Sequence, residues 1–103
     1  MILAKEVYIT TATFPKEEKY GLISQINRCS VSVPSNIAEG SSRSSNKEFA
    51  HFIKISLGSL FELETQLTLS NEFGIINNEV LDDLTSKIVT LQRMLLGFIK
   101  TLD

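Results

Sequence analysis

The side chains best suited to chemistry lie in one short stretch, Arg43-Ser-Ser-Asn-Lys-Glu-Phe-Ala-His51. Glu48 and His51 have the Glu-x-x-His spacing with which some four-helix bundles hold paired metal ions. Such a site needs a second motif of the same kind, and His51 is the only histidine of the chain. We therefore expect no metal centre in this protein, and no other cofactor.

Nucleophilic catalysis has no better support in the sequence. A nucleophile such as Cys29 needs a nearby base, and His51 is the one side chain with a suitable intrinsic pKa. The sequence contains no nucleophile elbow and no glycine-rich phosphate loop. A lone cysteine is more typical of a small core residue, and it excludes an internal disulfide. The sequence thus indicates a protein that is not an enzyme and has no small-molecule substrate.

The same stretch has the features of an anion site. Ser45-Asn-Lys-Glu48 is a capping box, so a helix begins there with free amides and a partial positive charge. Arg43 and Lys47 flank this helix end and together suit a phosphate group. Arg28, Lys54 and Arg93 extend the basic surface only if folding brings them near. A capped, solvated turn explains the same residues without a ligand, so both interpretations stay open.

Four helices are expected around this stretch, over about residues 2–12, 15–41 and 46–73, and from Asn77 or Asn78 to about residue 102. The last one repeats apolar residues at heptad spacing from Leu81 to Leu102, the pattern of helices that cross at about 20°. Short connections between long helices make neighbours antiparallel. The sequence predicts one all-α domain, residues 1–103, folded as an antiparallel up-down four-helix bundle.

Pro34 lies inside the second expected helix, where it removes one backbone hydrogen bond. Apolar residues keep a helical spacing through the proline, from Ile23 to Ile37, so we expect one continuous, kinked helix. A rival interpretation makes residues 30–33 a strand, because Ser-Val-Ser-Val alternates with period two. Tyr20 is expected on the same apolar side of this helix. Gly40 is expected to end the helix in the left-handed conformation, and Gly74 is expected to end the third helix.

Two features of the helices predict contacts beyond the helix itself, one for a side chain and one for a groove between helices. Glu64 falls inside the apolar arc of the third helix, where a carboxylate needs a partner or must become protonated. We expect it to pair with an arginine from a neighbouring helix, Arg28 before Arg93. The first helix, of about 12 residues, is far shorter than its neighbours of about 26 residues. Part of the groove between the long helices is thus predicted to lack cover, either because the chain begins late or because another subunit fills the gap.

The composition sets further bounds on function. With 43% hydrophobic residues and a mean hydropathy of +0.09, the chain is apolar for a solitary small domain, which suggests burial against another subunit. A net charge of −2 gives no overall basic field for nucleic acid, although a local basic patch is compatible with it. No stretch approaches the ~20 apolar residues that cross a bilayer. The first residues, Met1-Ile-Leu-Ala, have no basic region ahead of a long apolar segment, so we do not expect them to be a signal peptide. We expect a cytoplasmic protein with no membrane partner.

A set of motifs extends over nearly the whole chain. It comprises Phe14-Pro15, Glu17-Glu18 and Tyr20-Gly21-Leu22, then Val31-Ser-Val-Pro-Ser-Asn-Ile-Ala-Glu-Gly40, Arg43, Ser45, Lys47-Glu48-Phe49, Gly58-Ser59-Leu60 and Glu62-Leu-Glu-Thr-Gln-Leu67. Its central part is marked by Pro34, Asn36, Glu39 and Gly40, and its last part contains Glu64. The set resembles the four-helix bundle proteins encoded within 23S rRNA intervening sequences.

This resemblance implies a left-turning antiparallel bundle that commonly forms a ring-like homopentamer and has no established enzymatic activity. The chain is also similar to the accessory protein of diversity-generating retroelements, whose pentamer is described as binding nucleic acid and the reverse transcriptase through basic surfaces. The resemblance thus implies a non-enzymatic homo-oligomeric scaffold that contacts RNA or DNA through Arg28, Arg43, Lys47 and Lys54. The alternative is a protein–protein interaction module with no nucleic-acid role.

Overall fold

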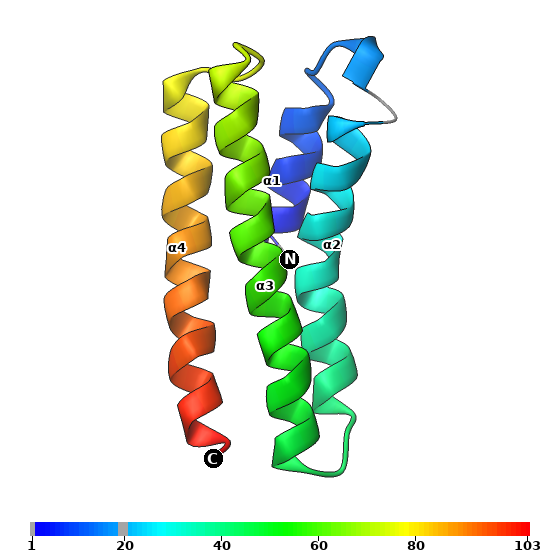
Figure 1. Ribbon diagram of the computed structural model, residues 1–103, viewed down its shortest axis with the longest axis vertical. Coiled ribbons are helices and arrows are strands. Elements are labelled where there is room, and N and C mark those ends of the chain that lie inside the picture. Colours follow the sequence, from blue (N-terminus) through cyan, green and yellow to red (C-terminus); the bar gives the residue numbers. More distant parts are fainter. Residues whose placement is uncertain (1, 19–20) are drawn as a thin grey trace.

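The computed structural model describes residues 2–18 and 21–103 and has four α-helices. They are α1 (Ile2–Thr11), α2 (Leu22–Ser41), α3 (Asn46–Glu72) and α4 (Asn78–Thr101), with a short 3-10 helix at Lys16–Glu18. The helices lie side by side, with the α2–α3 turn at one end and the α3–α4 connection at the other (Figure 1). The all-α four-helix architecture is confirmed. The rival strand at residues 30–33 is wrong, because these residues are helical.

The second helix begins later than expected, at Leu22 rather than near residue 15. Gly21 is the residue before the first turn, and its backbone, with φ −104° and ψ −100°, is not helical. Lys16–Glu18 therefore form a separate turn ahead of α2. Tyr20, which was expected on the apolar stripe of this helix, lies outside the described residues. From Leu22 onward α2 continues through Pro34 to Ser41, and a bend at the proline stays a prediction.

Gly40 has a different role from the one expected, because α2 does not end there in the left-handed conformation. Among the described residues a positive φ occurs only at Gly74, which follows α3 as predicted. A Cβ atom placed on Gly40 would lie 2.8 Å from Cβ of Phe52 and 2.9 Å from Cδ1 of Phe49. Gly40 is thus required by the close approach of α2 to α3.

Small hydroxyl side chains continue this close approach along the two helices. Ser56 donates a hydrogen bond to the Val33 carbonyl at 2.9 Å, and the Ser32 and Ser59 hydroxyls lie 2.9 Å apart. Asn36 donates to the Ser32 carbonyl at 2.8 Å and to its hydroxyl at 3.0 Å. These contacts pair polar groups that would be costly to bury alone. The α2–α3 boundary is thus both tight and polar.

The apolar core lies between the helices and includes the predicted stripe of α4. Leu84, Ile88 and Leu95 are buried, while Phe98 remains 38% exposed and packs edge-to-face on Phe49 at 5.2 Å between ring centroids. The other large core side chains are Val7, Ile26, Val33, Ile53, Leu60, Leu63 and Leu67. Each is worth roughly 1.5–3 kcal/mol when fully buried, so these contacts outweigh the helix caps.

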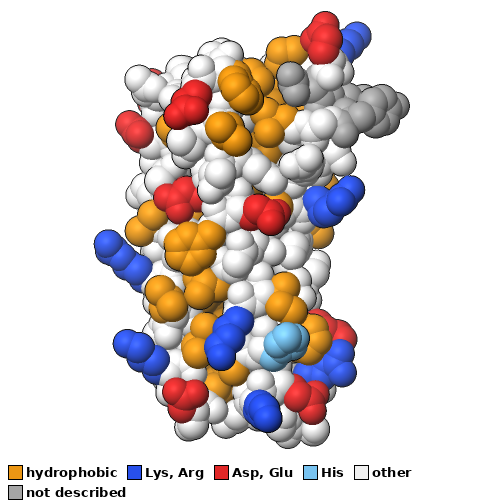
Figure 2. Space-filling model, viewed as in Figure 1, with side chains coloured by type: hydrophobic (Ala, Val, Ile, Leu, Met, Phe, Trp, Pro, Cys, Tyr) orange, Lys and Arg blue, Asp and Glu red, His pale blue; other side chains and the backbone are white. Residues whose placement is uncertain are grey.

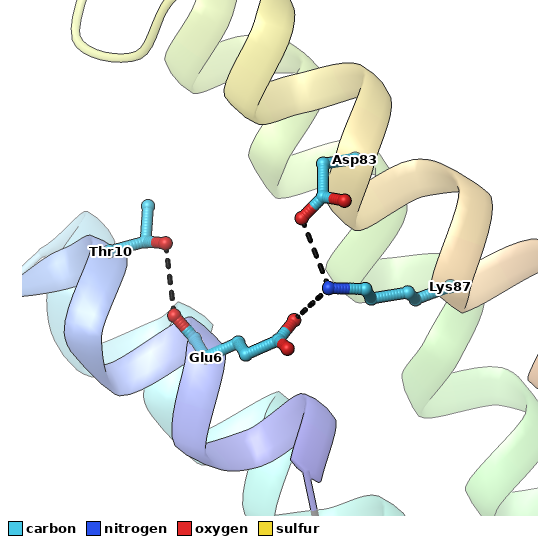
Figure 3. Close-up of polar contacts among 4 residues, drawn as sticks. All are labelled: Glu6, Thr10, Asp83 and Lys87. Carbon is cyan, nitrogen blue, oxygen red and sulfur yellow. Dashed lines mark hydrogen bonds and ion pairs between the residues drawn. The ribbon is translucent and has the colours of Figure 1, made fainter.

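The first helix is short, as predicted, with 10 residues against 27 in α3. It packs against α2 and α4 and lies beside only the upper half of the long helices (Figure 1). Lys87 of α4 joins it through Glu6 at 2.5 Å and also contacts Asp83 at 3.1 Å (Figure 3). The hydrogen bond to Glu6, then that to Asp83, raises the pKa of Lys87.

We predict that Gly40→Ala destabilises the protein by about 1–3 kcal/mol, since the new methyl group overpacks the contact with Phe49 and Phe52. Gly97→Ala is the matched control, because a Cβ there meets no atom within 4 Å. Alanine inside α4 should stabilise by roughly 0.5–1 kcal/mol. Urea unfolding measures both changes, and a neutral or stabilising Gly40→Ala would refute the close α2–α3 approach.

Candidate nucleic-acid interface

A surface hollow lies where α2 turns into α3. We call it the corner hollow, and it is lined by Arg43, Ser45, Lys47, Glu48, His51, Phe52 and Lys54. The turn at residues 42–45 supplies Arg43 and Ser45 and places them beside the first turns of α3, which supply the other residues. The structure thus brings together Arg43, Lys47 and Lys54, three of the four cations selected from the sequence. That they contact nucleic acid stays a prediction.

One face of α3 carries much of this hollow. Lys47, His51 and Lys54 follow one another at intervals of four and three residues, which places them on the same side of a helix, and all three are exposed. His51 was considered only as a metal ligand or a catalytic base. The same spacing could have identified it as a neighbour of the two lysines.

The N-terminus of α3 is capped by Ser45, whose hydroxyl accepts a hydrogen bond from the Glu48 amide at 3.1 Å. This half of the expected capping box is confirmed. The return bond, in which the Ser45 amide would donate to the Glu48 carboxylate, is absent from the hydrogen bonds of the described residues. The Glu48 carboxylate instead lies exposed at the rim of the corner hollow, where it reduces the positive potential.

Arg43 is held over the hollow by two contacts. Its guanidinium pairs with the Glu39 carboxylate one turn earlier, and it lies over the Phe52 ring, 4.8 Å from the centroid. Both members of the ion pair are more than one-third exposed, so their pairing is worth at most about 1 kcal/mol. A phosphate can therefore replace Glu39 as the partner of Arg43 at low cost. Glu39 acts here as a positioning residue.

Aromatic rings lie among the cations. The His51 and Phe52 rings meet edge-to-face, with centroids 5.5 Å apart and an interplanar angle of 73°. Phe52 also carries the Arg43 guanidinium on its ring. The corner hollow thus combines positive charge with flat aromatic surface. The cations of this site were selected from the sequence, whereas the aromatic rings beside them were not predicted.

Arg28 lies apart from the other three cations. It is exposed on α2, about 13 residues before the end of that helix, which corresponds to roughly 20 Å along the helix axis. It is not among the residues that line the corner hollow. The expectation of one basic surface that includes Arg28 is therefore not met by the fold.

Glu64 has a different partner from the one expected. Gln92, buried in α4, donates a hydrogen bond from Nε2 to the Glu64 carboxylate at 3.1 Å. The ion pairs of the described residues involve Arg43 and Lys87, and neither Arg28 nor Arg93 pairs with Glu64. A neutral amide from the facing helix thus satisfies the carboxylate. Gln92 was missed because it interrupts the apolar pattern of α4 without carrying a charge.

The two ends of the bundle differ in charge. In Figure 2 most Lys and Arg side chains of the visible face lie in its lower part, near the α2–α3 turn, together with the histidine. Four carboxylates, Glu72, Glu79, Asp82 and Asp83, lie on or next to the α3–α4 connection at the other end. The net charge of −2 therefore conceals a local basic region.

Cys29 has no role in this region. Its thiol is buried and donates a hydrogen bond to the Glu62 carboxylate at 2.8 Å. Burial, then this hydrogen bond and the nearby charge of Glu62, raises the pKa of Cys29 to about 12. Since the thiolate is the reactive form, Cys29 is a poor nucleophile at neutral pH.

The described residues have neither a metal-binding cluster nor a helix that could span a membrane. Residues 2–18 and 21–103 contain no group of three or more His, Cys, Asp or Glu side chains that could hold a metal ion. Within the same ranges, each helix is too short or too polar to cross a membrane.

Comparisons with known proteins identify relatives of the whole bundle. A family model described as 23S rRNA-intervening sequence protein matches residues 1–97. The fold matches the crystal structure of a protein with unknown function from the S23 ribosomal protein family of Bacteroides thetaiotaomicron, with a TM-score of 0.84 and 21% identity. That match covers 96% of this chain and 90% of the other, and at this identity it shows a shared fold. Among curated proteins, none matches the chain.

We predict that ionisation of the Cys29 thiol lowers the stability of the folded protein at alkaline pH. Its folded-state pKa of about 12 lies above the ordinary value of 9.0, so the stabilisation is complete below pH 9 and is lost as the pH rises toward 12. Cys29→Ser keeps a hydroxyl donor for Glu62 but does not titrate. Urea unfolding between pH 7 and 11 should show the original protein losing stability faster than the variant. Parallel curves would contradict the prediction.

Proposed function

This chain belongs to the 23S rRNA-intervening sequence protein family, and on that premise we propose that it is a non-enzymatic, homo-oligomeric scaffold that binds RNA through the corner hollow. The observation that carries the proposal is the position of Arg43, Lys47 and Lys54 around one hollow in a chain of net charge −2. Cations gathered in this way, far from most carboxylates, favour a polyanion over a neutral partner.

The arrangement suits a phosphate backbone. Lys47 and Lys54 are two turns apart on one face of α3, about 10 Å along the helix, and Arg43 lies beside them at the turn. Lysine contacts phosphate as a point charge, whereas the arginine fork binds two phosphate oxygens at once. All three side chains are exposed, so they can contact the phosphates of an RNA strand without any change in the helices.

RNA binding is tested by titrating a labelled structured RNA at low and moderate salt. We predict that the triple variant Arg43→Gln, Lys47→Gln, Lys54→Gln loses most of its affinity and that its salt dependence flattens by about 0.7–0.9 per phosphate contact removed. The matched control removes the same charge elsewhere, with Lys5→Gln, Lys16→Gln and Arg28→Gln, and should bind nearly as well as the original protein.

Two results would count against RNA binding at the corner hollow. Equal losses in the two triple variants would show that net charge, and not this site, determines binding. No binding at low salt would remove the RNA role altogether and leave the protein-interaction module as the function.

The homo-oligomer is supported by the outer face of α3 beyond the corner hollow, over residues 55–69. Gly58 lies in the middle of this helix, where glycine costs roughly 1 kcal/mol relative to alanine, yet a Cβ there would meet no atom within 4 Å. Ile55, Phe61 and Leu69 are exposed on the same side, Phe61 to 49%. We infer that a helix of a second copy packs closely here, since such an approach accounts for both the glycine and the exposed apolar groups.

Gly58→Ala distinguishes a packed face from a free one because the two cases predict opposite signs. If a second copy packs on α3, the added methyl group should weaken association, and light scattering should show dissociation at concentrations where the original protein is assembled. Phe61→Ser should have the same effect. If the face is free, Gly58→Ala should instead raise the free energy of unfolding by about 0.5–1 kcal/mol and leave the mass unchanged.

A further inference from the structure

The corner hollow differs from an ordinary basic patch because planar side chains lie among its cations. His51 is exposed, and its ring meets Phe52 edge-to-face at 5.5 Å. The Arg43 guanidinium, which is also planar, lies 4.8 Å from the centroid of the Phe52 ring. A patch that contacts only phosphates has no need of these flat surfaces.

The position of His51 relative to the two lysines is suited to a strand. On the outer face of α3, His51 lies about 6 Å from Lys47 and about 4.5 Å from Lys54 along the helix axis. A chain of phosphates that contacts both lysines therefore passes directly by the imidazole. The base attached between those phosphates can lie against the His51 ring.

Such a contact is open only to an unpaired base. In a duplex each base is stacked on its neighbours and its flat faces are hidden, so side chains reach backbone and groove edges instead. In a single strand the faces are free and stack on aromatic rings or on arginine, each stack being worth about 1–3 kcal/mol. Rings beside phosphate-binding cations are thus typical of single-strand recognition.

We propose that the corner hollow binds an unpaired nucleotide, with its phosphates on Arg43, Lys47 and Lys54 and its base stacked on His51 beside Phe52. The inference rests on the proposed RNA-binding function and adds the form of the RNA that is recognised. Two other roles for His51 find no support, because its ring is exposed rather than in the core and no metal cluster includes it among the described residues.

The experiment compares three labelled probes of equal length: an unstructured single-stranded RNA, the same sequence as a duplex, and a strand of abasic nucleotides. Binding is measured to the original protein and to His51→Ala, His51→Phe and Thr90→Ala. Thr90 is an exposed residue of α4, outside the hollow and away from the outer face of α3, and serves as the control. Circular dichroism checks that each variant is folded.

We expect the single strand to bind roughly tenfold more tightly than the abasic strand, and more tightly than the duplex. His51→Ala should remove most of that advantage and leave abasic binding unchanged. His51→Phe should restore it, because phenylalanine keeps a stacking face without the imidazole nitrogens. Thr90→Ala should behave like the original protein.

The outcomes separate this inference from the function on which it rests. If single-stranded, duplex and abasic probes bind equally and His51→Ala has no effect, while the Arg43, Lys47 and Lys54 triple variant still loses binding, the base-stacking inference is overturned and RNA binding stands. If no probe binds the original protein at low salt, RNA binding itself fails, and the inference fails with it.

Discussion

The close approach of α2 to α3 is the constraint on which the rest of the structure depends. Gly40 leaves no room for a side chain against Phe49 and Phe52, and the hydroxyl pair Ser32–Ser59 holds the same two helices together further along. The contact also determines the site, because Phe52 touches Gly40 through its Cβ and carries Arg43 on its ring. Packing of the bundle and placement of the Arg43 guanidinium thus share one side chain.

Electrostatics in this protein act locally. Charges further apart than a Debye length, about 8 Å at physiological ionic strength, are largely screened from each other at the surface. The carboxylates near the α3–α4 connection are at the opposite end of a molecule 43 Å long, so they do little to reduce the potential at the corner hollow. Glu39 and Glu48 are the carboxylates that matter there, and Glu39 also orients Arg43.

Helical periodicity predicted most of the fold because it reports which face of a helix is buried. The heptad spacing identified the buried residues Leu84, Ile88 and Leu95, and a left-handed glycine correctly follows α3 at Gly74. Two glycines were harder to interpret. Gly21 precedes α2 and delays its start, whereas Gly40 serves a contact between helices, and local sequence does not distinguish a glycine needed for a turn from one needed for space.

The candidate site was predicted only in part, because it depends on which helix faces meet. Arg43 and Lys47 were expected beside one helix end, and the fold adds Lys54 to them, whereas Arg28 lies about 13 residues before the end of α2. The pairing of Glu64 with Gln92 depends on the register between α3 and α4, which single-sequence patterns do not report. The position of His51 beside Lys47 and Lys54 was not predicted, although intervals of four and three residues place all three on one side of a helix.

Amide hydrogen–deuterium exchange with and without single-stranded RNA tests most directly the claim that the α2–α3 corner is the binding surface. The RNA should slow exchange in the turn at residues 42–45 and in the first two turns of α3, with little change at the α3–α4 connection. Slowed exchange centred on the α3–α4 end or on the middle of α2, with none at the corner, would contradict the account.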